Sequence, residues 1–344
     1  MAQEDADGRL GRNLTTPDWD VASEADLIIE AAFEDLDVKI GIFQRLDALA
    51  KAGAILASNT SYLDLNRIAG ATKRPWDVVG LHFFAPANIM RLLEIIQVDE
   101  TAPDVLATSF AFARKIGKQA VLARVCDGFI GNRIFAAYRR QCEIMLEEGA
   151  LPEEIDAALE VFGFAMGPFA VADLSGLDIA WSRRKRLAAI RDPRERYVPI
   201  ADMLCERGRF GQKAGAGWYH YPEPARPRKP DPVVRALIEE LSASRSITRR
   251  RLNAEEIQKR ALAATVNEAA LVLEDRIARR ASDIDVVFVH GYGFPATRGG
   301  PIFWAAQQDP KVLEQVLDVV EISTGYGFRR AKVIPDILRG DASP

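Results

Sequence analysis

The chain is poor in cysteine and histidine. Three cysteines (Cys126, Cys142 and Cys205) and three histidines occur among its 344 residues. The cysteines are odd in number, show no CxxC spacing and have no accompanying histidine cluster, which argues against a disulfide framework and against a zinc site. We therefore expect no metal, and a reducing, cytoplasmic environment.

Long apolar runs and an excess of positive charge are also absent. No stretch approaches the roughly 18 apolar residues of a membrane span, and the opening MAQEDADGRLGRNL lacks the apolar core of a signal peptide. The net charge of −4 gives no general reason to expect nucleic acid. Hydrophobic residues at 48% and charged residues at 27% are typical of a globular chain. We expect neither a membrane protein nor a nucleic-acid-binding protein.

Short apolar runs alternate with segments of helical periodicity between residues 26 and 125. The helical segments follow the first, second and third runs, the last of them spanning 103–118. The runs of strand length lie at 26–33, 54–61, 77–84 and 119–125. This alternation is typical of a parallel α/β sheet.

Helical periodicity dominates after residue 130, with a weak internal repeat. Residues 132–156 resemble residues 259–285, and each segment leads into a glycine-rich turn, which predicts a duplicated helical unit. Between them, five prolines in 221–232 predict an extended connection. Asn253 and Glu256 have the spacing of a capping box at a helix start. We expect domains at 1–125, 126–222 and 223–344.

Polar side chains that follow strands are the candidates for chemistry, because ligands bind at the carboxyl ends of parallel strands. Ser61, His82 and Asn132 have such positions, and Glu94 lies twelve residues after His82. A neutral imidazole oriented by a carboxylate can remove a hydroxyl proton. Taken singly, however, each residue is explained as well by a buried structural histidine or an ordinary ion pair. For the other two histidines, His220 and His290, we expect packing roles alone.

Six motifs together resemble a known family. In order they are SNTS, GLHFFAPANIMRLLEII, VCDGFIGNR, AMGPFAVADLSGLDI, GRFGQKAGAGWYHY and GYGFPATRGGP. They are similar to successive signatures of the 3-hydroxyacyl-CoA dehydrogenases, especially the dehydrogenase part of multifunctional fatty-acid β-oxidation enzymes. The resemblance runs from about residue 20 to about residue 330. Six motifs in this order identify a family more specifically than any single motif does.

The resemblance implies NAD-dependent oxidation of (S)-3-hydroxyacyl-CoA to 3-ketoacyl-CoA. It implies that His82 is the catalytic base and Glu94 its orienting carboxylate. Ser61 and Asn132 are then catalytic contacts that also bind the acyl-CoA substrate. The positions that it assigns to the NAD site are Glu34, Lys39, Ser61 and Ala85.

The sequence departs from the family pattern in two places. No GxGxxG turn, which would cradle the cofactor pyrophosphate, occurs, and we expect none to fit in the polar residues before the first strand. Ala85 replaces the usual asparagine or serine, so one hydrogen bond to the nicotinamide amide is lost. We therefore expect an α/β plus all-α chain: an incomplete Rossmann-like parallel sheet, with an unpaired edge, followed by a duplicated helical domain.

Two other classes of function stay open. The chain is alternatively a truncated, non-catalytic remnant that binds CoA ligands or partner subunits without redox turnover. Basic runs at 182–186, 225–229 and 248–251 suit the phosphates of CoA and, less well, nucleic acid. The family resemblance also suggests a homo-oligomer.

Overall fold

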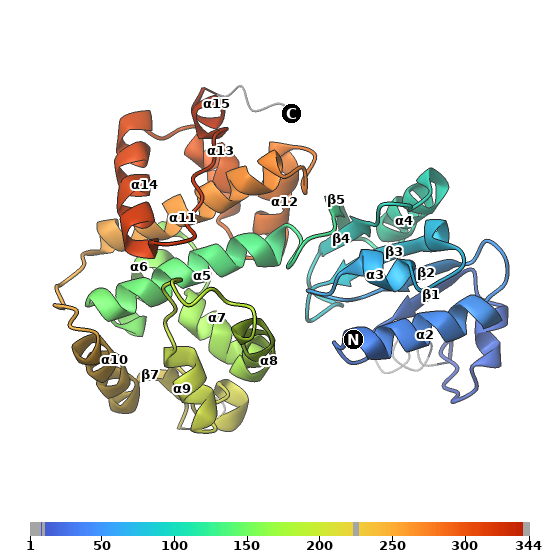
Figure 1. The fold of residues 1–344 in the computed structure, drawn as a ribbon, viewed down its shortest axis with the longest axis horizontal. Coiled ribbons are helices and arrows are strands. Elements are labelled where there is room, and N and C mark those ends of the chain that lie inside the picture. Colours follow the sequence, from blue (N-terminus) through green and yellow to red (C-terminus); the bar gives the residue numbers. More distant parts are fainter. Residues whose placement is uncertain (1–7, 9–10, 223–226, 340–344) are drawn as a thin grey trace.

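The computed structural model describes residues 8, 11–222 and 227–339, so part of the proline-rich connection predicted at 221–232 lies outside the described residues. Figure 1 shows two units side by side, a sheet unit in blue to teal and a helical unit in green to red. They are joined where the last strand of the sheet leads into helix α5 (Gly131–Glu148).

The sheet unit contains five strands in the order β1-β2-β3-β4-β5. Neighbouring strands are parallel except for β3 and β4, which are antiparallel. The bounds are β1 Leu27–Glu30, β2 Ile55–Ser58, β3 Val78–Phe83, β4 Leu92–Gln97 and β5 Gln119–Arg124. The expectation of an all-parallel alternation is therefore wrong at β4, a strand that the sequence reading missed. The connection 84–91 contains no helix, and short connections of this kind join antiparallel strands.

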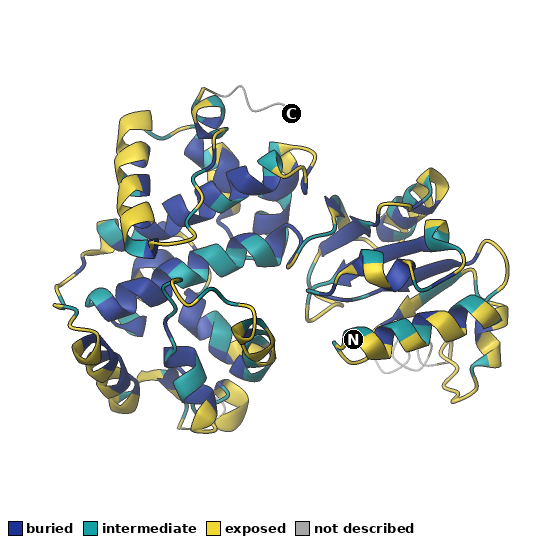
Figure 2. Ribbon diagram, in the orientation of Figure 1, coloured by how far each residue is buried: buried dark blue, intermediate teal, exposed yellow. Residues whose placement is uncertain are grey.

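Helices cover both faces of the sheet. Helix α2 (Leu36–Leu49) and helix α3 (Leu65–Ala69) pack on the face that carries Leu56 and Val78. On the opposite face, α4 (Pro103–Lys115) packs against a second apolar cluster. The central strands β2, β3 and β4 are consequently buried on both sides, as Figure 2 shows for β3 and β4.

One edge of the sheet is open in the part of the chain that the structure describes. There β1 pairs only with β2. Ile29 on this strand is 37% exposed, and Phe33 just beyond it is 80% exposed. The predicted unpaired edge is therefore confirmed for the described residues.

The helical unit is built around α5 and α11 (Ala254–Glu274), which pack together at its centre. No helix of the described ranges is long and apolar enough to cross a membrane. The surrounding elements are α6 Pro152–Phe162, α7 Pro168–Ser175, α8 Leu177–Ala188, α9 Ile200–Glu206, β6 Tyr219–His220, β7 Lys229–Pro230, α10 Pro232–Ser244, α12 Ala281–Gly291, α13 Pro301–Ala305, α14 Pro310–Thr324 and α15 Ile334–Leu338.

The internal repeat is visible in two matching helix caps. Asp156 in α6 accepts hydrogen bonds from two backbone N–H groups at the start of α7. Asp285 in α12 does the same at the start of α13. A carboxylate at a helix N-terminus satisfies N–H groups that have no partner within the helix. In both halves of the helical unit, an aspartate on one helix thus caps the N-terminus of the next helix.

Two local predictions need correction. Asn253 caps α11 by accepting from the backbone N–H of Glu256, but the Glu256 side chain bonds Arg250 and Arg260, so the capping box is only half formed. His220 is exposed, because successive strand residues point to opposite faces and Tyr219 takes the inward position. The packing role predicted for His220 is therefore wrong.

The buried cap carboxylates make a prediction about stability and pH. Burial raises the pKa of Asp156 from 3.8 to about 6, against the opposing effect of its hydrogen bonds. The folded state then holds a proton that the unfolded chain has released, so this group lowers the free energy of unfolding as pH rises from 3.8 to about 6. We expect the difference in unfolding free energy between wild type and Asp156→Asn to shrink by up to about 3 kcal/mol across that range. Urea unfolding at several pH values measures it, and a difference independent of pH contradicts it.

Candidate active site

His82 and Glu94 face each other across the antiparallel pair of strands β3 and β4. They are direct register partners, and His82 Nδ1 lies 2.7 Å from Glu94 Oε2. His82 is only 4% exposed and Glu94 is fully buried. Because the carboxylate accepts the proton on Nδ1, the other ring nitrogen, Nε2, carries the lone pair in the neutral form of the ring. The pair therefore presents a base whose tautomer is set by its partner.

Glu94 is itself held in place by the helical unit. Its second oxygen, Oε1, accepts a hydrogen bond of 2.9 Å from the backbone N–H of Gly131, the first residue of α5. Positive partial charge at a helix N-terminus favours a carboxylate there. The base is thus oriented from both units at once.

Aromatic rings surround the imidazole. The ring of Phe84 lies 4.5 Å and the ring of Phe129 lies 5.7 Å from that of His82, measured between centroids. These apolar neighbours limit the access of water to His82, which strengthens its interaction with Glu94. The imidazole and the carboxylate therefore meet in a buried site lined by aromatic rings.

Ser61 and Asn132 meet beside this pair. Asn132 Nδ2 lies 3.5 Å from the carbonyl oxygen of Ser61, and Asn132 Oδ1 accepts a 2.8 Å hydrogen bond from the hydroxyl of Tyr292. Asn132 directly follows Gly131, which bonds Glu94. The structure thus brings His82 together with Glu94, and Ser61 together with Asn132, with the start of α5 linking the two pairs.

The residues predicted for the cofactor lie at the carboxyl ends of β1 to β3. Glu34 accepts hydrogen bonds from the Thr60 hydroxyl and from the backbone N–H of Ser61, so it ties two of these loops together. Lys39 is fully buried and pairs with Glu30 at 2.7 Å, so its side chain is not available for a direct contact with a ligand in this structure. Ala85 is exposed after the end of β3.

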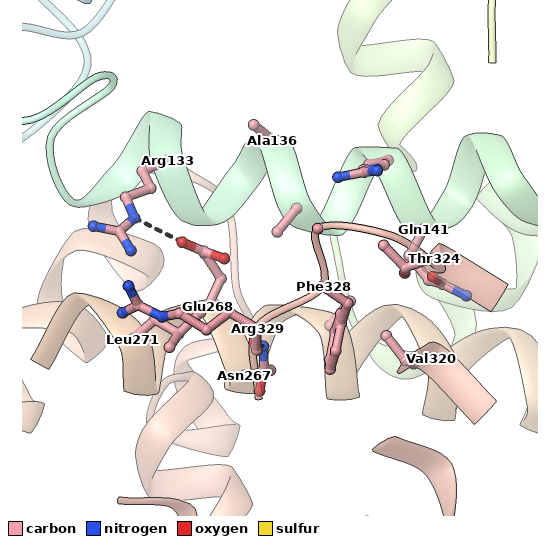
Figure 3. Close-up of a pocket in the computed structure, with 14 residues that line it drawn as sticks. Arg133, Ala136, Gln141, Asn267, Glu268, Leu271, Val320, Thr324, Phe328 and Arg329 are labelled. Carbon is pink, nitrogen blue, oxygen red and sulfur yellow. Dashed lines mark hydrogen bonds and ion pairs between the residues drawn. The ribbon is translucent and has the colours of Figure 1, made fainter. Parts of the chain in front are cut away.

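A separate cavity of about 440 Å³ lies between α5 and α11 (Figure 3). Arg133 at its edge pairs with Glu268 at 2.6 Å and with Asp275 at 2.7 Å. None of the four residues predicted to be catalytic lines it. This cavity is therefore distinct from the candidate active site.

Two residues of the site escaped the sequence reading. Gly131 contributes a backbone N–H, which no side-chain pattern reveals. Tyr292 lies in the motif GYGFPATRGGP, so the signal was present, but 160 positions separate it from Asn132. Only the packing of α12 against the sheet shows that the two meet.

Comparison with known proteins identifies the family of the chain. The family description "3-hydroxyacyl-CoA dehydrogenase, NAD binding domain" matches residues 1–126, and "3-hydroxyacyl-CoA dehydrogenase, C-terminal domain" matches residues 128–221. The crystal structure of 3-hydroxybutyryl-CoA dehydrogenase from Escherichia coli superposes with a TM-score of 0.79 over 98% of this chain and 86% of that one, at 24% identity. At that identity the likeness concerns the fold.

Two further proteins resemble the chain over most of its length. The peroxisomal bifunctional enzyme of Cavia porcellus is 46% identical over 310 residues, covering 86% of this chain. The dehydrogenase part of multifunctional enzyme 1 from C. elegans is 28% identical, with a TM-score of 0.61 over 93% of this chain and 77% of that one. The chain spans only 43% of the Cavia protein. The Cavia relative is named as a peroxisomal enzyme, so it does not support the expectation of a cytoplasmic protein.

The two family matches together span more than half of the sequence, and the first of them describes an NAD-binding domain. The motif order read from the sequence points to the same family. The chain therefore belongs to the 3-hydroxyacyl-CoA dehydrogenase family, whose cofactor is NAD.

Proposed function

We propose that this chain oxidises (S)-3-hydroxyacyl-CoA to 3-ketoacyl-CoA in fatty-acid β-oxidation, with NAD as the hydride acceptor. The observation that carries the proposal is the buried pair of His82 and Glu94, 2.7 Å apart, next to Ser61 and Asn132. An oriented neutral imidazole is the base that removal of a hydroxyl proton requires.

In the proposed mechanism, His82 Nε2 accepts the proton of the 3-hydroxyl group. The imidazolium that forms is stabilised by Glu94, whose charge is held by Gly131. Ser61 and Asn132 contribute hydroxyl and amide donors that orient the substrate oxygen. NAD, when bound, takes the hydride that leaves C3.

The loops that follow β1 and β2 offer a place for the nicotinamide end of NAD. The loop after β1 and the loop after β2 are tied together by Glu34, next to Ser61, and this arrangement fits the nicotinamide end of the cofactor. We propose that Lys39 acts there indirectly, because its ammonium lies 3.8 Å from Glu34. The described residues offer no GxGxxG turn for the pyrophosphate.

The second candidate is a chain that binds CoA ligands or partner subunits without redox turnover. The open edge of β1 in the described residues favours it, because an unpaired strand edge can pair with another chain. Titration of NADH fluorescence, together with acetoacetyl-CoA reduction, separates the two candidates. Binding and turnover support the dehydrogenase; a folded protein with neither supports the second candidate.

His82→Gln tests the base. We expect kcat for acetoacetyl-CoA reduction to fall about 10²- to 10⁴-fold, because the amide cannot exchange the proton with the substrate oxygen. His290→Gln is the matched control, since His290 takes no part in the proposed site and is expected to retain activity. A His82→Gln enzyme with the wild-type kcat would falsify the assignment.

Glu94→Gln tests the orienting carboxylate. The new amide group is able to donate to Nδ1, which places the ring proton on Nε2 and removes the basic lone pair from the substrate side. We expect kcat to fall about 10²- to 10⁴-fold with a much smaller change in KM. Glu100→Gln, an exposed change just after β4, is the control. An equal loss in both variants contradicts a specific role for Glu94.

Ala85→Asn tests the cofactor contact. An asparagine at this exposed position restores an amide that can hydrogen-bond the nicotinamide, and one neutral hydrogen bond contributes about 0.5–1.5 kcal/mol. We expect NADH to bind roughly two- to tenfold more tightly, measured by its fluorescence. Ala87→Asn, two residues further along the same exposed loop, should leave NADH affinity unchanged. The same gain in both variants contradicts the placement of the nicotinamide.

A further inference from the structure

The second helical repeat contributes a side chain to the candidate active site. Tyr292 follows α12, and its hydroxyl donates to Asn132 Oδ1 at 2.8 Å. Burial raises the pKa of Tyr292 well above its usual value, so the hydroxyl keeps its proton and remains a donor. Asn132 thereby gains a partner 160 positions away in the sequence.

The ring of Tyr292 is packed on several sides. Its centroid lies 5.0 Å from that of Phe288 and 5.2 Å from that of Phe135. Phe84, which lies against the His82 ring, meets Tyr292 edge-on at 5.6 Å. The ring of Phe84 therefore contacts both the His82 imidazole and the Tyr292 ring.

Gly131 makes room for this ring. A Cβ atom at Gly131 would lie 2.3 Å from the Tyr292 ring, closer than any real contact. The backbone N–H of the same residue bonds Glu94. The start of α5 is thus shaped to accept the tyrosine while it anchors the carboxylate.

The orientation of the Asn132 amide follows from its two neighbours. The carbonyl of Ser61 only accepts hydrogen bonds, so the amide nitrogen faces it at 3.5 Å. The amide oxygen then faces Tyr292, whose hydroxyl satisfies it. Without that hydroxyl, the oxygen loses its donor and the amide loses one of the two contacts that hold it.

We propose that Tyr292 is a positioning residue that holds the Asn132 amide so that the N–H not facing the Ser61 carbonyl points toward the substrate oxygen. The proposal rests on the proposed function, because the substrate oxygen is that of the 3-hydroxyacyl or 3-ketoacyl group. Tyr292 does not touch the reacting atoms; it acts through Asn132. The second repeat therefore takes part in substrate recognition as well as in packing.

The first experiment reads the Asn132 side chain directly in the protein without ligand. Protein labelled with ¹⁵N-asparagine is compared as wild type and as Tyr292→Phe, with Asn132→Asp to assign the side-chain amide signal. We expect the Asn132 NH₂ signal to shift or broaden in Tyr292→Phe. Tyr138→Phe is the matched control, because its ring lies in the same aromatic cluster, 5.6 Å from Phe135. An unchanged Asn132 signal in Tyr292→Phe overturns the proposal.

The second experiment is a double-mutant cycle on acetoacetyl-CoA reduction. We expect Tyr292→Phe to lower kcat/KM about tenfold in the wild-type background and less than twofold in Asn132→Ala. The same loss in both backgrounds indicates a purely structural role and overturns the proposal. If the wild type shows no turnover, the proposed function fails, whereas the NMR comparison still decides whether Tyr292 positions Asn132.

Discussion

The antiparallel pairing of β3 with β4 is the constraint on which the candidate site depends. It sets His82 directly opposite Glu94, so the imidazole and the carboxylate meet through strand register and need no flexible loop. Side chains opposite each other on one face of a strand pair lie within contact distance. The same carboxylate accepts a hydrogen bond from Gly131 at the start of α5, so Glu94 contacts both the sheet and the helical unit.

Buried carboxylates with hydrogen-bonded or charged partners lie at the ends of the strands. Glu94 has no exposure to solvent and keeps partners on both oxygens. Glu30 at the end of β1 and Lys39 in α2 form a second buried ion pair. Removing one partner of a buried pair leaves an uncompensated charge, which costs about 3–5 kcal/mol. Glu34 holds the loops that follow these strands, through hydrogen bonds from the Thr60 hydroxyl and the Ser61 backbone N–H.

The two halves of the helical unit contribute different side chains to the candidate site. Asp156 and Asp285 cap equivalent helices in the same way. The first repeat supplies Asn132 beside the sheet, whereas the second supplies the Tyr292 hydroxyl that meets it. Contact of α12 with β4 and β5 makes this possible, and the backbone bond from Arg124 to Ile277 ties the second repeat to the last strand. The two halves thus use the same kind of helix cap but supply different polar groups, Asn132 and the Tyr292 hydroxyl, to the candidate site.

The sequence by itself determined the strands β1, β2, β3 and β5 and the helical character after residue 130, because apolar periodicity is a property of neighbouring residues. His82, Glu94, Ser61 and Asn132 were predicted as site residues from motifs that resemble a family, and their roles stay predictions. The sequence revealed neither β4 nor its antiparallel direction, since a strand's partner is chosen by packing across the sheet. Nor did it reveal that Lys39 is buried, that Gly131 anchors Glu94 or that Tyr292 bonds Asn132. Those contacts join residues far apart in the chain, and only the tertiary structure decides which of them meet.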